Sequence, residues 1–197
     1  LAPGICDSIN KDGVKYSKIS LIPNGCDHDI CSPYEFIEKK DPSNIKGLSN
    51  KINQNDLIAV YAGVHGIANG LDYIIDVARI LKKRKISDIK FLLIGDGILK
   101  QELIEKANKY KLNNCFFLAP MKKKDLAKML IKSAHVGLMI LKDVPEFYNG
   151  TSPNKFFDYL TFGLPVFTNY PGWLGDLIIK NRCGKVVPNN NKELFCD

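Results

Sequence analysis

Long apolar runs are absent from this 197-residue chain, and so is any segment that resembles a secretion signal. No stretch of about 18 consecutive apolar residues occurs, so we expect no membrane-spanning helix. No basic segment followed by an apolar one stands near the start, so no signal peptide is visible. The longest apolar stretches, within residues 91–95 and 136–141, have the length of buried strands. With 45% hydrophobic and 25% charged residues, the composition is typical of a soluble globular protein.

Metal-site and disulfide patterns are also missing. The six cysteines are Cys6, Cys26, Cys31, Cys115, Cys183 and Cys196. Cys26 and Cys31 lie close together, but no second pair of cysteine or histidine residues follows at the spacing of a zinc site. We therefore expect no metal and no cofactor, and reduced cysteines in a cytoplasmic protein.

Basic residues outnumber acidic ones, 28 to 21, and much of the excess lies in two clusters, 82–85 and 122–124. These clusters are typical of solvated helix ends. They are also consistent with attraction to phosphorylated substrates or anionic lipid headgroups, which would allow peripheral association with the inner face of the membrane. Basic and aromatic residues are not interleaved as in nucleic-acid-binding modules, so we expect no nucleic-acid partner.

From residue 57 onward, short apolar runs alternate with amphipathic segments. The expected strands are 57–63, 89–95, 114–120, 135–141, 164–169 and 183–189; the expected helices are 71–84, 98–110, 123–133, 153–163 and 172–181. This alternation predicts an α/β fold, a Rossmann-like parallel sheet flanked by helices on both faces. Ligands of such sheets bind beyond the carboxyl ends of the strands. That rule selects four loops: 63–70, 95–97, 119–123 and 143–153.

The first part of the chain has a different character. We predict a helix that ends at Gly13, a short strand over 19–25 that closes in a Pro-Asn-Gly turn, and a polar linker over 38–56. Residues 1–47 are therefore interpreted as the remnant of an N-terminal domain with an interdomain linker, and 48–197 as the Rossmann-like domain. Because the sequence starts at Leu1, we expect a piece cut from a larger two-domain protein.

Glycine-rich turns follow the first two strands. Gly63, Gly66 and Gly70 would let the backbone approach a ligand, and the next helix would present its N-terminal amides to an anion. The spacing is not that of the dinucleotide fingerprint G-x-G-x-x-G, and a tight turn without any ligand is the alternative. His65, in this loop, could donate a hydrogen bond to a phosphate. Residues 95–97, Gly-Asp-Gly, form a similar but less specific turn.

The loop before the fourth helix is the most informative. Thr151 or Ser152 could cap this helix. Lys155 stands in the first turn, where the helix dipole disfavours cations, which suggests an anionic ligand nearby; a solvent-facing lysine is the alternative. Asp158, one turn later, could accept hydrogen bonds from paired sugar hydroxyls, or could be an ordinary surface residue.

At these residues the sequence resembles retaining glycosyltransferases of family 4, which have the GT-B fold. The segments that carry the resemblance are 18–27, 61–81, 91–103 and 150–167, and the run SPNKFFDY…GLPV (152–166) is the most specific. This run is similar to the branch of amino-sugar transferases in bacterial O-antigen and capsule assembly.

The resemblance implies a nucleoside-diphosphate sugar donor, with UDP as the expected nucleotide, and transfer to a saccharide or lipid-linked acceptor in surface polysaccharide synthesis. It places Asp158 at the ribose-binding Glu of the family, the backbone around Ala119–Met121 at the base, and residues 150–152 at the diphosphate or sugar. The full set of expected substrate contacts is Gly63, His65, Gly66, Gly95, Asp96, Gly97, Ala119, Met121, Gly150, Thr151, Ser152, Asn154, Lys155 and Asp158. No catalytic residue is assigned, and the isolated fragment is expected to bind the donor and transfer nothing.

Three departures from the family pattern affect this interpretation. The first Glu of the family's Glu-x7-Glu motif would fall at Gly150, and the usual Arg and Lys would fall near Val64 and Asn69, so these charges are missing. The second Glu is shortened to Asp158. We hypothesise that Lys155 and the helix amides neutralise the donor phosphates instead. A GT-B-type sugar-nucleotide epimerase and a degenerate nucleotide-binding partner subunit are the alternatives.

Overall fold

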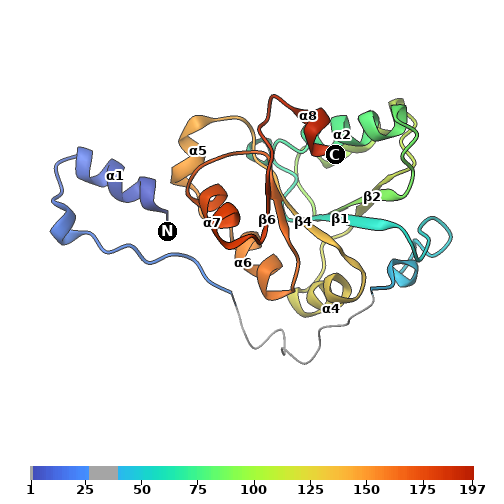
Figure 1. The fold of residues 1–197 in the computed structure, drawn as a ribbon, viewed down its shortest axis with the longest axis horizontal. Helices are drawn as coiled ribbons and strands as arrows, with labels where there is room; N and C mark the ends of the chain where they lie inside the picture. The colour runs from blue at the N-terminus through green and yellow to red at the C-terminus, as the bar shows by residue number, and fades with distance from the viewer. Residues whose placement is uncertain (1, 27–39) are drawn as a thin grey trace.

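The computed structural model describes residues 2–26 and 40–197 and contains a six-stranded sheet (Figure 1). Its strands are β1 Leu57–Ala62, β2 Ile89–Ile94, β3 Cys115–Leu118, β4 Val136–Met139, β5 Val166–Thr168 and β6 Gly184–Val186. They lie in the order β3-β2-β1-β4-β5-β6, and every neighbouring pair is parallel. The predicted α/β fold class is therefore confirmed, with each strand present at its expected place.

Helices connect the strands. The α-helices are α1 Pro3–Lys11, α2 Asp72–Lys83, α3 Lys100–Lys109, α4 Lys123–Ser133, α5 Pro145–Gly150, α6 Asn154–Thr161, α7 Trp173–Asn181 and α8 Lys192–Phe195; short 3-10 helices are η1 Tyr16–Lys18, η4 Pro42–Asn44 and η5 Ile67–Asn69. The five helices expected after residue 57 are all present. The sequence analysis missed α5, which lies inside the loop 143–153, and α8, because both are too short to show a helical apolar period.

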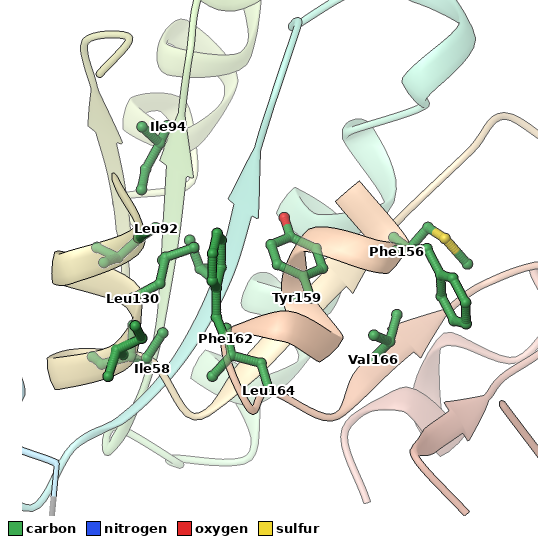
Figure 2. Packing of buried hydrophobic residues seen from close by; sticks show 14 of the residues in the cluster. Ile58, Leu92, Ile94, Leu130, Phe156, Tyr159, Phe162, Leu164 and Val166 are labelled. Atoms are coloured by element: carbon green, nitrogen blue, oxygen red, sulfur yellow. The ribbon is translucent and has the colours of Figure 1, made fainter. Parts of the chain in front are cut away.

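The two faces of the sheet bury different sets of side chains. Along β1, Ile58 and Val60 join a core with α4, α6 and α7, whereas Ala59 and Tyr61 join a second core with α2 and α3. Figure 2 shows the first core, in which Tyr159 of α6 lies among other apolar side chains beside the strands. Successive strand residues point to opposite faces, so strands covered on both sides read as continuous apolar runs.

The direction of strand addition reverses between β1 and β4. From β1 the chain adds β2 and β3 on one side, and then returns to place β4, β5 and β6 on the other. The chain therefore leaves β1 and β4 in opposite directions at the carboxyl edge of the sheet, and α/β sheets bind their ligands at such a point. A left-handed Gly70 brings these loops into contact, and Lys142 donates its backbone N–H to the Ala68 carbonyl at 2.9 Å.

The segment before β1 corrects two predictions. Residues 19–25 form no strand. Residues 40–56, expected to be a loose polar linker, are packed on the domain, because Ile45, Leu48 and Ile52 are buried in the core that contains α4. Three apolar residues were enough to anchor a segment whose composition is otherwise polar.

Helix α1 lies away from the sheet and contacts α5 (Figure 1). The contact is close, because a Cβ on Gly4 would lie 2.6 Å from the backbone oxygen of Asn149. Cys31 and the last residue of the segment 18–27, both part of the sequence analysis, lie outside the described residues. The other five cysteines are free. No helix in the described ranges is long and apolar enough to cross a membrane.

Candidate functional site

A cleft of about 380 Å³ opens at the carboxyl ends of β1, β2 and β3. It is lined by Ala62, Gly63, Val64, Ile94, Gly95, Asp96, Pro120, Met121 and Leu126. Four of the expected contact residues, Gly63, Gly95, Asp96 and Met121, are thus brought together. The cleft joins the first three loops that the sequence selected, and α6 borders it near Gly63 through Lys155.

The glycines after β2 have a packing role. A Cβ on Gly95 would lie 1.9 Å from the Gly63 carbonyl oxygen, and one on Gly97 would lie 2.6 Å from the His65 carbonyl oxygen. Both residues also have positive φ, at 142° and 153°. Glycine at these positions lets the loop after β2 lie directly against the loop after β1. Asp96 holds the turn, with Oδ1 accepting the Gly97 N–H at 2.8 Å.

Lys155 extends from the first turn of α6 toward the loop after β1. Its Nζ lies 3.1 Å from Tyr61 Oη, 3.4 Å from Asn69 Oδ1 and 4.2 Å from the centroid of the Tyr61 ring. Within residues 2–26 and 40–197, no carboxylate lies within 4.0 Å of this ammonium group. Burial lowers the pKa of Lys155 to about 8. The result is a half-buried cation held by neutral groups, which favours an anionic ligand.

Tyr61 and Asn69 were missed as partners of Lys155. Tyr61 reads as one apolar residue of a buried strand, and its hydroxyl bonds the Val64 carbonyl as well as Lys155. Asn69 holds the same carbonyl through its amide nitrogen. No spacing in the sequence links these residues to α6, because the contact arises only when β1 and β4 lie side by side in the sheet.

The expected side-chain cap of α6 is absent. Pro153 occupies the N-cap position, and no side chain of the described residues bonds the first-turn amides. Thr151 Oγ1 instead donates to the Phe147 carbonyl at 2.7 Å, and the Ser152 carbonyl accepts from Asn24 Nδ2 at 2.6 Å. The prediction that Thr151 or Ser152 caps this helix is therefore wrong. The Phe156 amide donates to the Pro153 carbonyl at 3.1 Å, and the amides of Asn154 and Lys155, which have no partner among the described residues, are the ones left for an anion.

Asp158 lies one turn further along α6 and forms an ion pair. Its Oδ1 is 3.0 Å from Nζ of Lys123, the first residue of α4. The Asp158 side chain is 24% exposed and that of Lys123 is 45% exposed. The sequence analysis treated Lys123 only as part of a basic cluster, and the pairing depends on how α4 and α6 pack side by side on the sheet.

His65 is fully buried and does not line the cleft. Its ring lies near those of Tyr61 and Phe117, and neither ring nitrogen has a hydrogen-bond partner among the described residues. Burial, then the neighbouring Lys100, lowers the pKa of His65, so the ring is neutral near pH 7. The structure places it behind the loop, away from the cleft surface.

The remaining expected contacts lie around this centre. Gly150 ends α5, and a Cβ there would meet nothing within 4 Å. Helix α7 holds the following residue, because Trp173 Nε1 donates to the Thr151 carbonyl at 2.7 Å. Asn154 and Ala119 are exposed, and Gly66 precedes η5. In the described ranges, no group of three or more His, Cys, Asp or Glu side chains could hold a metal ion.

Residues 46–197 match the family described as glycosyl transferases group 1. The chain belongs to this family. The match covers the whole sheet and both cores except Ile45, so the cleft and α6 lie entirely within the family domain. By sequence, no curated protein is similar enough to this chain to count as a relative.

Several solved structures share the fold. HepE from Anabaena in complex with UDP-glucose is 16% identical with a TM-score of 0.72, over 98% of this chain and 50% of that one. WaaG, a glycosyltransferase involved in lipopolysaccharide biosynthesis, is 16% identical with a TM-score of 0.71, over 100% and 50%. A mutant of TarM from S. aureus, in complex with fondaparinux, alpha-GlcNAc-glycerol and UDP, is 18% identical with a TM-score of 0.71, over 97% and 33%. This chain thus spans at most half the length of these three proteins.

Proposed function

We propose that this domain binds the nucleoside-diphosphate sugar donor of a retaining glycosyltransferase, and that the donor is a UDP-sugar. The diphosphate lies between Lys155 and the first turn of α6, the ribose meets Asp158, and the base lies near residues 119–121. The observation that carries this proposal is the half-buried Lys155 ammonium, which has no carboxylate partner in the described part of the chain and points at the strand-order reversal.

The chemistry of transfer is consistent with this arrangement. Cleavage of the sugar–phosphate bond leaves negative charge on the departing diphosphate, and a fixed cation with aligned helix amides stabilises that charge without a metal ion. Lys155 takes the place of the cationic pair that the sequence lacks near Val64 and Asn69. The bound UDP and UDP-glucose in TarM and HepE support a uridine donor for a domain of this fold.

The acceptor is proposed to be a saccharide or a lipid-linked saccharide in surface polysaccharide synthesis, of the O-antigen or capsule kind, with reaction at the cytoplasmic side of the membrane. The basic cluster 122–124, exposed at the start of α4, would favour a membrane surface that carries anionic lipids. The acceptor site and part of the catalytic machinery are proposed to lie on a second domain before residue 48, so the isolated domain binds the donor without transferring the sugar. Family membership favours transfer over an epimerase or a degenerate partner subunit.

Calorimetric titration of the chain with UDP, GDP and ADP tests the proposal, with Lys155→Ala beside the matched control Lys180→Ala. Lys180 is an exposed lysine in the last turn of α7. We expect saturable binding of UDP, at least about tenfold weaker in Lys155→Ala and unchanged in the control. Equal UDP affinity in the two variants would contradict the role of Lys155, and absence of UDP binding to the unchanged chain would overturn the donor assignment.

A further inference from the structure

Lys123 contacts the carboxylate to which the proposed function assigns the donor ribose. Its Nζ lies 3.0 Å from Oδ1 of Asp158, and no second partner of the Asp158 carboxylate occurs among the described residues. We propose that Lys123 is a positioning residue for Asp158 and makes the site selective for ribonucleotides over 2′-deoxyribonucleotides. This inference rests on the proposed function.

The chemistry of a ribose explains why a lysine–carboxylate pair suits it. An ionised carboxylate only accepts hydrogen bonds, and an ammonium group only donates them. Each of the two ribose hydroxyls can do both. Asp158 alone would satisfy the hydroxyl protons and leave their oxygen lone pairs to water, whereas Lys123 beside it supplies the missing donors. The pair therefore recognises both neighbouring hydroxyls, and removal of the 2′-hydroxyl takes away the hydrogen bonds that this hydroxyl exchanges with the pair.

The position of Lys123 allows this contact. Met121 and Leu126, on either side of it in the sequence, both line the cleft, whereas Lys123 and Asp158 are not among the lining residues, so the pair lies beside the cleft. Its side chain is 45% exposed and can reach a ligand while it holds Asp158. Asp158 comes from α6, and the ion pair fixes a short carboxylate that its own helix would leave free to rotate. Lys155, three residues earlier on α6, points to the loop after β1, so the two ends of the donor have separate anchors.

The neighbouring Lys124 supplies a matched control. It is exposed, carries the same charge one residue away, and forms no ion pair with the described residues. Lys123→Met and Lys124→Met therefore remove equal charge from the same helix end, and only the first breaks the contact with Asp158. Lys123→Arg keeps a cation within reach of Asp158 and serves as the conservative variant.

The test is titration of the 197-residue chain and these three variants with UDP, 2′-deoxy-UDP and inorganic pyrophosphate. We expect the unchanged chain to prefer UDP over 2′-deoxy-UDP about tenfold. Lys123→Met should weaken UDP about tenfold and lose most of that preference, while its affinity for pyrophosphate, which has no ribose, stays the same. Lys124→Met should match the unchanged chain, and Lys123→Arg should regain part of the preference. Thermal melts of the variants verify that each is folded.

Each other outcome overturns the inference in a recognisable way. Equal UDP affinity in the two methionine variants shows that Lys123 has no role, and an equal loss in both shows an effect of net charge alone. Tighter UDP binding in Lys123→Met shows that the lysine blocks Asp158. If UDP binding depends on Lys155 but not on Lys123, this inference fails and the proposed function stands. If the unchanged chain does not bind UDP, both fail together.

Discussion

Two charged side chains stand about one turn apart on α6 in opposite surroundings. Lys155 lies half-buried against a tyrosine ring and an asparagine, with no carboxylate near it in the described residues. Asp158 is paired at 3.0 Å with a lysine from another helix. An unneutralised, partly buried charge destabilises a fold, whereas a paired one near the surface has little net effect. Lys155 is therefore the side chain whose charge the described residues do not balance, and this unbalanced charge points to a ligand.

Charge reversal at the unpaired side chain should have the largest effect. Lys155→Glu places a carboxylate beside the expected diphosphate, and we expect UDP affinity to fall at least about a hundredfold. Asp158→Asn, measured in the same calorimetric series, should weaken UDP by about tenfold. If the two losses were equal, the contrast between the two surroundings would have no bearing on binding.

The next largest effect should be the pH dependence of UDP affinity, which should identify Lys155 as the group that titrates. The pKa of free Lys155 is about 8, and an anionic ligand raises it, so binding takes up a proton above pH 8. UDP affinity should therefore fall as pH rises above 8, with a slope that approaches about tenfold per pH unit. Lys155→Arg stays charged and should show a flat profile from pH 7 to 9 in titrations at constant ionic strength. A slope that persists in this variant would assign the titration to another group.

The contribution of Lys155 to the free energy of unfolding should change with pH in the opposite direction, because it rises over the pH range in which UDP affinity falls. The pKa of Lys155 in the fold, about 8, lies below its ordinary value of 10.5, so between these values the unfolded chain binds more protons. The penalty of burying the cation is complete below pH 8 and is relieved as pH rises through this window. We expect Lys155→Met to raise the free energy of unfolding at pH 7 by about 1 kcal/mol, and by less at pH 9.5. Urea denaturation at both pH values measures this, and a constant difference would exclude a titrating Lys155.

The paired side chain should matter least for stability. Asp158→Asn breaks an ion pair whose lysine is 45% exposed, and we expect a change of no more than about 1 kcal/mol in the free energy of unfolding. Urea denaturation gives this value directly. A loss of several kcal/mol would mean that the pair holds α4 and α6 together, and any binding defect of this variant would then report on the fold.

The sequence was sufficient for the sheet because its strands are apolar on both faces and its helices carry a clear apolar stripe. It also selected Lys155 and Asp158 from their positions in the first turn of α6 and one turn later. It could not supply Tyr61, Asn69 or Lys123, whose contacts with α6 arise only when β1, β4 and α4 meet in space. The capping of α6 was mispredicted because Thr151 bonds backward to the Phe147 carbonyl, and no pattern distinguishes this bond from a cap.

The contact of Gly95 with the Gly63 carbonyl has a consequence for how this cleft can change over evolution or in the laboratory. With 1.9 Å between that oxygen and a Cβ added at Gly95, the loop after β2 cannot gain a side chain at this position unless the loop after β1 moves as well. The shape of the cleft therefore cannot be changed by a single substitution at Gly95. Met121 lines the same cleft and is exposed, so a selection for altered ligand preference should accumulate its first changes there.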